Sequence, residues 1–179
     1  AGLRRGREVQ VVLSWLLLLL LLCGERIMAG WEAYIDTQLL LKSDGVQTDH
    51  SPINFGAIVS TDGAIVADQG FHITQDEATF LSQVVKAPEF KDEYKAANAF
   101  KHGDSVGSYT LGGVKYVVSR ADDGVVLSSC PSSEGGCIIG VSATMIILAH
   151  VYAWSDQTEV QSANVMVAGL KTMFEEMGY

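Results

Sequence analysis

The chain has 179 residues, of which 48% are hydrophobic and 18% charged, and its formal net charge at pH 7 is −9. This composition is typical of a globular domain with a real core and not of a disordered segment. An acidic surface repels phosphate backbones, so the charge argues against nucleic-acid binding. Cys130 and Cys137 flank a turn and could face each other across a hairpin, but the odd count of three cysteines favours free thiols in a reducing compartment.

The first 27 residues differ from the rest of the chain. They begin with several arginines and continue with an apolar run from Val11 to Cys23 that contains seven consecutive leucines. The run is short for a membrane span, and a signal peptide would need a small-x-small cleavage site, which does not precede Gly24. We therefore interpret residues 1–27 as a non-native upstream or leader-like segment and residues 28–179 as one domain. A genuine secretory leader is the alternative.

The first predicted element of the domain is an amphipathic helix from Trp31 to about Leu41. Trp31, Tyr34 and Ile35 recur at the spacing of one helical face, and Leu39 continues the row. The polar segment after it ends the helix. Two short apolar strands, 55–59 and 64–67, then flank a Thr-Asp-Gly turn and predict a hairpin.

A second helix is predicted from Thr74 to about Lys86, because Thr74 and Glu77 have the spacing of a capping box. Residues 89–101 carry apolar residues at helical spacing and predict a third helix, followed by a loop at 103–107. The strands predicted after this point are 108–111, 114–120, 125–129, 137–141 and, as a central strand buried on both faces, the apolar run 144–154.

The last predicted helix runs from Thr158 to Met177, with Thr158 and Gln161 as a capping box. It is apolar on two sides, so we expect it to contact both the sheet and a neighbouring helix, which we take to be the Trp31 helix. Adjacent hairpins predict an antiparallel sheet with helices on its faces, which is an α+β domain.

No catalytic pattern is visible in the sequence. The four histidines, His50, His72, His102 and His150, lack metal-ligand spacing, and no nucleophile elbow, P-loop or dinucleotide fingerprint occurs. We therefore expect a binding module, with no cofactor, and not an enzyme. If the first and last helices lie side by side, their aromatic ends form a shallow apolar patch of the kind that binds proline-rich peptides. The alternative is that Trp31 and Tyr34 are ordinary core residues.

Five short motifs together resemble the profilin family. They are Trp31-x-x-Tyr34-Ile35-Asp36, Thr61-Asp-Gly63, Leu111-Gly-Gly-Val-Lys-Tyr116, Asn164-Val-Met-Val167 and Gly178-Tyr179, in this order from Met28 onward. The resemblance implies an antiparallel sheet with the N- and C-terminal helices packed together on one face and smaller helices on the other. It also implies three partners, namely monomeric actin, proline-rich segments of actin-assembly factors, and phosphoinositides.

The resemblance further implies a cytoplasmic, monomeric regulator of the actin cytoskeleton. Such a protein sequesters actin monomers, blocks one filament end and speeds nucleotide exchange on actin. Carried over residue by residue, the resemblance assigns poly-proline binding to Trp31, Tyr34, Met173, Phe174 and Tyr179. It assigns actin binding to Lys115, Arg120, His150, Gln161 and Asn164.

Two departures from the family pattern leave alternatives open. Many profilins have an aromatic residue after the Asp-Gly turn, where this chain reads Ala64-Ile-Val66-Ala, and the often lysine-rich stretch 128–142 has no basic residue here. One alternative is a profilin-like fold that binds proline-rich peptides but actin weakly or not at all. The other is a secreted antigen-type domain, if residues 1–27 are a true signal peptide.

Overall fold

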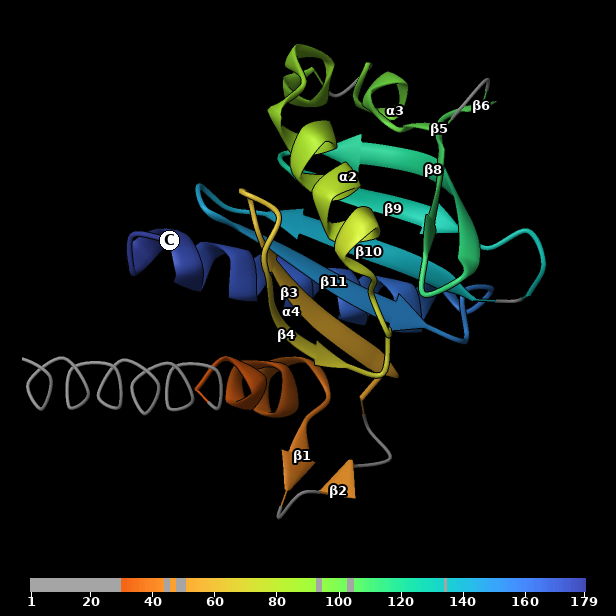
Figure 1. The fold of residues 1–179 in the computed structure, drawn as a ribbon. Coiled ribbons are helices and arrows are strands. Elements are labelled where there is room, and N and C mark those ends of the chain that lie inside the picture. The colour runs from red at the N-terminus through yellow and green to blue at the C-terminus, as the bar shows by residue number, and fades with distance from the viewer. Residues whose placement is uncertain (1–29, 44–45, 48–50, 93–94, 103–104, 134) are drawn as a thin grey trace, which may run out of the picture.

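The computed structural model describes residues 30–43, 46–47, 51–92, 95–102, 105–133 and 135–179 (Figure 1). The predicted leader-like segment 1–27, Met28 and His50 lie outside the described residues. Residues 30–34 are α-helical and lead directly into the π-helical segment η1. The elements that follow in chain order are η1 (Ile35–Leu39), β1 (Lys42–Ser43), β2 (Val46–Gln47), β3 (Phe55–Ser60), β4 (Ile65–Gln69), α2 (Gln75–Lys86), η2 (Pro88–Lys91), α3 (Ala96–Ala99), β5 (Lys101–His102), β6 (Ser105–Val106), β7 (Ser108–Leu111), β8 (Val114–Asp122), β9 (Val125–Ser129), β10 (Gly136–Val141), β11 (Met145–Val151) and α4 (Gln157–Glu176).

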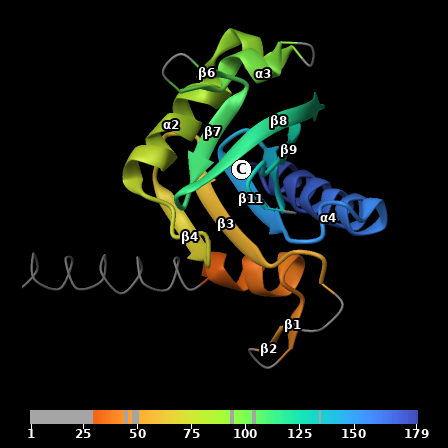
Figure 2. The same cartoon turned by 90° about the vertical axis from the view of Figure 1, so that its right-hand side faces the viewer.

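Seven strands form one antiparallel sheet in the order β4-β3-β11-β10-β9-β8-β7. Strand β11 lies inside this sheet, and all seven of its residues are buried, as predicted. It is shorter than the predicted 144–154, because it ends at Val151 and Tyr152 is already exposed. Helices α2 and α4 lie on opposite sides of the sheet (Figure 2). The predicted α+β fold is therefore confirmed, including the antiparallel sheet and the terminal helices.

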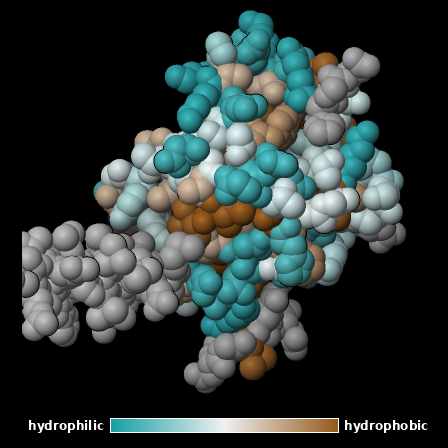
Figure 3. All heavy atoms as spheres, viewed as in Figure 1, coloured by the Kyte–Doolittle hydropathy of each residue, from teal (hydrophilic) through white to brown (hydrophobic). Residues whose placement is uncertain are grey.

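Alternation along the strands divides the core into two clusters. On the α4 side, Ile147 and Ala149 of β11 pack with Ile35 of η1 and with Val167 and Phe174 of α4. On the other side, Ile146 and Leu148 pack beneath α2 and the aromatic residues of β7 and β8. Apolar side chains also reach the surface around β3 and β4, between α2 and the N-terminal helical segment (Figure 3).

The N-terminal helical segment lies close against β3 at Gly56. A Cβ atom at this position would lie 2.7 Å from Cγ2 of Ile35 and 3.2 Å from Cδ1 of Leu39. Both side chains have no exposed surface. Only a residue without a side chain therefore allows η1 this close approach to the sheet.

Three sequence predictions are corrected here. The helix predicted over 89–101 is replaced by the short 3-10 segment η2 and by α3, which covers only 96–99. The loop predicted at 103–107 contains β6, which pairs with β5. The N-cap of α4 is Asp156, whose side chain accepts hydrogen bonds from the backbone N–H groups of Thr158 and Glu159. A carboxylate two positions before the predicted Thr158 cap satisfies these donors first. The capping box of α2 forms as predicted.

Candidate functional site

The two terminal helices meet at an aromatic cluster. The Trp31 ring lies 5.3 Å from the Phe174 ring and 5.0 Å from the Tyr179 ring, both edge-on, and 5.6 Å from the Tyr34 ring. Tyr34 lies 5.6 Å from Phe174. Edge-on and tilted contacts at this spacing are favourable for aromatic rings. The two ends of the described chain therefore build one site together.

The end of α4 holds Tyr179 in place through its backbone. The N–H of Tyr179 donates to the carbonyl of Phe174 at 2.8 Å, and the N–H of Gly178 donates to the carbonyl of Glu175 at 3.0 Å. Gly178 has a φ of +86°, so these bonds form a Schellman motif, which commonly ends a helix at a glycine. The motif turns the chain back and brings the Tyr179 ring within 6.3 Å of Phe174.

The cluster is buried on the side that faces the core and exposed on the side that faces solvent. Phe174 has no exposed surface and Trp31 is only 8% exposed, whereas Tyr179 is 39% exposed. Tyr34 and Met173 are half-buried, and the Tyr34 hydroxyl contacts the sulfur of Met177 at 3.8 Å. We call the outer parts of Trp31, Tyr34, Met173, Met177 and Tyr179 the terminal aromatic surface. Phe174 supports this surface from beneath and does not form part of it.

One further residue that packs on the same core cluster as the terminal aromatic surface was not in the predicted set. Val66 of β4 is partly buried against the same core cluster as Tyr34 and Met173. The sequence signal was its place in the strand after the Asp-Gly turn, where the family pattern has an aromatic residue.

Of the five residues predicted to bind actin, Lys115 and Arg120 lie on β8, on the face away from the α2-side cluster, and Gln161 and Asn164 lie on α4. Tyr116 and Val118 of β8 face the α2-side cluster, so alternation directs Lys115 to the other face. Arg120 lies beyond a register shift, next to Ala121, which also faces the α2-side cluster, and it pairs with Asp122 at 3.0 Å.

The other two are on α4. Gln161 is exposed, and Asn164 is half-buried with an Oδ1 that has no hydrogen-bond partner among the described residues.

The structure does not bring His150 together with these residues. His150 is 5% exposed and lies on the α2 side of β11, within 5.0–6.3 Å of the rings of Phe55, Phe71, Tyr116 and Tyr152. Burial lowers the pKa of the His150 imidazole below its ordinary value, and its Nδ1 has no partner among the described residues. The sheet separates this side chain from Gln161 and Asn164. The sequence could not reveal this, because a strand buried on both faces shows no polar alternation.

In the part of the chain that the structure describes, the two cysteines do not pair and the metal-ligand residue types do not converge. Cys130 and Cys137 are both buried free thiols. Burial raises the pKa of the Cys137 thiol to about 12, so it stays protonated at neutral pH. Within the described ranges, no three His, Cys, Asp or Glu residues converge to hold a metal ion.

Comparison with known proteins adds to this geometry. The family model described as profilin matches residues 29–179. The fold is similar to Acanthamoeba castellanii profilin IB, with a TM-score of 0.60, 25% identity, and 83% of this chain and 99% of that chain covered. For Schizosaccharomyces pombe profilin the values are 0.58, 24%, 83% and 99%. For LokiProfilin2, solved in complex with rabbit actin, they are 0.54, 14%, 80% and 96%.

Proposed function

This chain belongs to the profilin family, and from that premise we propose that it binds monomeric actin and proline-rich segments of actin-assembly factors, and so controls actin polymerisation. The observation that carries the peptide-binding part is the terminal aromatic surface. In this surface the partly exposed Tyr179 ring lies 5.0 Å from the Trp31 ring, and the buried Phe174 ring supports both from beneath. We infer that the protein acts by binding alone and makes or breaks no covalent bond.

The terminal aromatic surface suits a polyproline II helix for two reasons. A polyproline II segment is already extended, so docking it costs little conformational entropy. The proline rings can lie flat on Tyr34 and Tyr179. The Tyr179 hydroxyl can donate to a peptide carbonyl, which has no partner within a polyproline II helix. The edge-on contacts to the buried Phe174 fix both tyrosine rings before the peptide arrives, which reduces the entropy lost on binding.

The test of peptide binding is retention on immobilised poly-proline. Trp31 is nearly buried, so its removal would mix lost binding with lost stability. Tyr179→Ala is cleaner, because the side chain is exposed, and it should lower affinity at least tenfold while the melting temperature stays nearly constant. Tyr152→Ala, which removes an exposed tyrosine outside this surface, is the matched control. Equal retention of Tyr179→Ala and wild type would refute the peptide site.

For actin, we propose that the α4 side of the sheet and helix α4 form the binding face. Lys115 and Arg120 supply its basic groups, and Gln161 and Asn164 its polar ones. This assignment rests on the family pattern, on the place of Lys115 and Arg120 on the face of β8 away from the α2-side cluster, and on the place of Gln161 and Asn164 on α4. His150 is omitted, because the sheet covers it from that side.

Assembly of pyrene-labelled actin tests this face. Excess wild-type protein should slow spontaneous assembly, and Lys115→Glu should weaken that effect at least tenfold, because a like charge replaces a complementary one. Lys101→Glu, on the small β5–β6 hairpin, is the control. No slowing by the wild type would favour the second candidate, a profilin-fold protein that binds proline-rich peptides but not actin. The observation that favours this candidate is the missing basic residues in 128–142.

The same missing basic residues bear on phosphoinositides. Charge-assisted contacts to phosphate need Lys or Arg, and the stretch 128–142 supplies none. We therefore propose that phosphoinositide headgroups bind only weakly. Sedimentation with vesicles containing phosphatidylinositol bisphosphate should show little binding that depends on salt concentration. Tight binding abolished by salt would contradict this.

We further propose that residues 28–179 form the functional domain, with residues 1–27 outside it, and that the protein works as a monomer at the cytoplasmic actin cytoskeleton. Among the described residues, no helix has the length and apolar character needed to cross a bilayer. N-terminal sequencing of the natural protein tests the domain boundary. A start at Met28 or Ala29 would support it, whereas a start after a cleaved leader would support the secreted alternative.

A further inference from the structure

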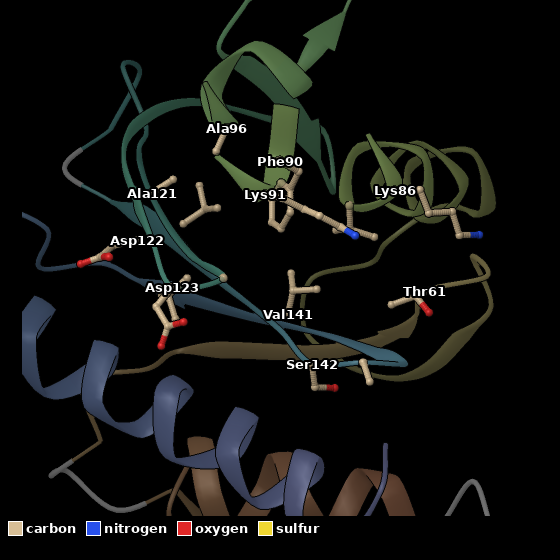
Figure 4. A pocket seen from close by; sticks show the side chains of 15 residues that line it. Thr61, Lys86, Phe90, Lys91, Ala96, Ala121, Asp122, Asp123, Val141 and Ser142 are labelled. Atoms are coloured by element: carbon tan, nitrogen blue, oxygen red, sulfur yellow. The ribbon is translucent and has the colours of Figure 1, made fainter. Parts of the chain in front are cut away.

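A hollow of about 920 Å³ opens on the α2 side of the sheet, between the end of α2, η2 and three turns of the sheet (Figure 4). Those turns are β3–β4, β8–β9 and β10–β11. None of the residues that line the hollow belongs to the terminal aromatic surface or to the proposed actin-binding set. The family assignment therefore leaves this hollow without a role.

The floor of the hollow is apolar. It is lined by Val85 of α2 and Phe90 of η2 on the helical side, and by Val126 and Val141 on the side of the sheet. Apolar floors with a few polar groups at the rim are typical of ligand sites, and the volume lies in the usual range. The floor can therefore accept an apolar side chain.

The rim carries opposite charges on its two sides. Lys86 and Lys91 lie on the helical side (Figure 4). On the other side, Asp122 ends β8 and pairs with Arg120, and Asp123 lies in the β8–β9 turn. Lys91 extends across the hollow (Figure 4). No ion pair or side-chain hydrogen bond joins the side chain of Lys91 or of Asp123 to another described residue. Lys86 donates only to the hydroxyl of Ser82, at 3.1 Å. Lys91 and Asp123 are thus free, within the described chain, to pair with a bound group.

We propose that this hollow binds a linear peptide segment in which an apolar residue lies between an acidic and a basic residue. A simple anion would meet Asp123, and a simple cation would meet both lysines, so either alone would face a like charge. A purely apolar ligand would bury the rim charges without a partner. A segment with both charges satisfies both sides while its apolar side chain fills the floor.

Fluorescence anisotropy with a labelled Gly-Glu-Leu-Leu-Lys-Gly peptide tests the proposal on the full chain. We expect saturable binding at low ionic strength that weakens as salt is added. Lys91→Gln should weaken binding about fivefold, since exposed ion pairs contribute up to about this factor. Asp123→Asn should have a similar effect. Asparagine tolerates the left-handed backbone of this residue, whose φ is +46°.

A double-mutant cycle assigns each charge of the peptide. If its glutamate meets Lys91, the peptide with Gln in place of Glu should bind Lys91→Gln and wild type equally. If its lysine meets Asp123, the peptide with Gln in place of Lys should bind Asp123→Asn and wild type equally. Ala143→Trp, an exposed substitution at the mouth of the hollow, should lower affinity at least tenfold. Lys101→Gln and Tyr179→Ala are the controls and should leave binding unchanged.

Three results would overturn the proposal. One is the absence of saturable binding up to about 1 mM peptide, the upper end of specific affinities. Another is additive effects in both cycles, which would mean that the peptide charges do not meet these residues. The third is displacement of the peptide by decanoate with dependence on Lys91 but not on Asp123, which would indicate a site for small amphipathic anions. Melting temperatures of each variant within a few degrees of wild type exclude unfolding as the cause.

Discussion

Two aromatic clusters in this molecule have similar ring spacing but different surroundings. In the central cluster, Tyr109 lies 4.9 Å from Phe100 and 5.5 Å from Tyr116, and all three side chains are at most 1% exposed. In the terminal cluster the spacings are 5.0–6.3 Å, but Tyr179 is 39% exposed. Ring contacts alone therefore do not make a binding surface. The terminal cluster lies where two helix ends meet, so some of its rings remain available to a partner. The central cluster lies beneath α2 and α3, which cover its rings.

Removing a ring from the central cluster should have the largest effect on stability. Tyr116→Ala should lower the free energy of unfolding by about 3–5 kcal/mol, because it leaves a cavity in a closed core. Urea unfolding followed by tryptophan fluorescence measures this. The folded fraction should still bind poly-proline with wild-type affinity. A loss below about 1 kcal/mol would mean that the central cluster is loosely packed.

Adding a ring to the terminal cluster should strengthen binding. Val66→Trp places an aromatic side chain on the core cluster against which Tyr34 and Met173 also pack, on the strand where the family pattern has one. An extra aromatic contact contributes about 0.5–1.5 kcal/mol, so poly-proline affinity should rise up to about tenfold. Titration of tryptophan fluorescence with a proline decamer measures the change. Val46→Trp, at an exposed site on β2, is the control and should leave affinity unchanged.

Straining the end of α4 should have a smaller effect on the terminal cluster. Gly178→Ala forces a side chain into a left-handed conformation and should cost about 1 kcal/mol. It should also weaken poly-proline binding a few-fold, because Tyr179 loses its fixed position. Gly169→Ala, within α4 and with no atom within 4 Å of an added Cβ, should instead stabilise the protein slightly. Equal behaviour of the two variants would argue against the Schellman motif as the cause.

The smallest expected effect is a pH dependence of the free energy of unfolding, which originates from His150 on the α2 side of the sheet. Burial lowers the pKa of His150 below its ordinary value of 6.5, so the unfolded chain takes up the proton first as the pH falls. The free energy of unfolding should therefore be highest above pH 6.5 and decline below it. His150→Phe should show a shallower decline between pH 7.5 and 5.5 in urea titrations. Identical slopes would show that other groups carry the pH dependence.

Much of the fold was predictable, because local signals agreed with it. The capping box at Thr74, the hairpin strands and the apolar run of β11 each predicted an element that the structure contains. The prediction for residues 89–101 was wrong, because there the local signal did not agree with the fold. Their helical spacing is real, but Pro88 begins a short 3-10 turn and the regular helix covers only 96–99.

The candidate sites were less predictable, because their geometry depends on contacts between distant segments. The sequence indicated that Trp31 and Tyr179 would meet, but not that Phe174 would lie wholly beneath them. It also assigned His150 to a surface on the wrong side of the sheet. The hollow beside Lys91 was not predicted at all, because its walls come from several separate turns and helices.

Gly56 lies outside the terminal aromatic surface but determines how the helix that carries Trp31 and Tyr34 sits on the sheet. This residue lies in β3, and its missing side chain lets Ile35 seat directly on the strand. A single methyl group there would lift the N-terminal helix away from the sheet and tilt the indole and phenol rings it carries. A substitution at Gly56 can thus weaken binding of a partner, although the added carbon atom contacts neither the partner nor any of the rings.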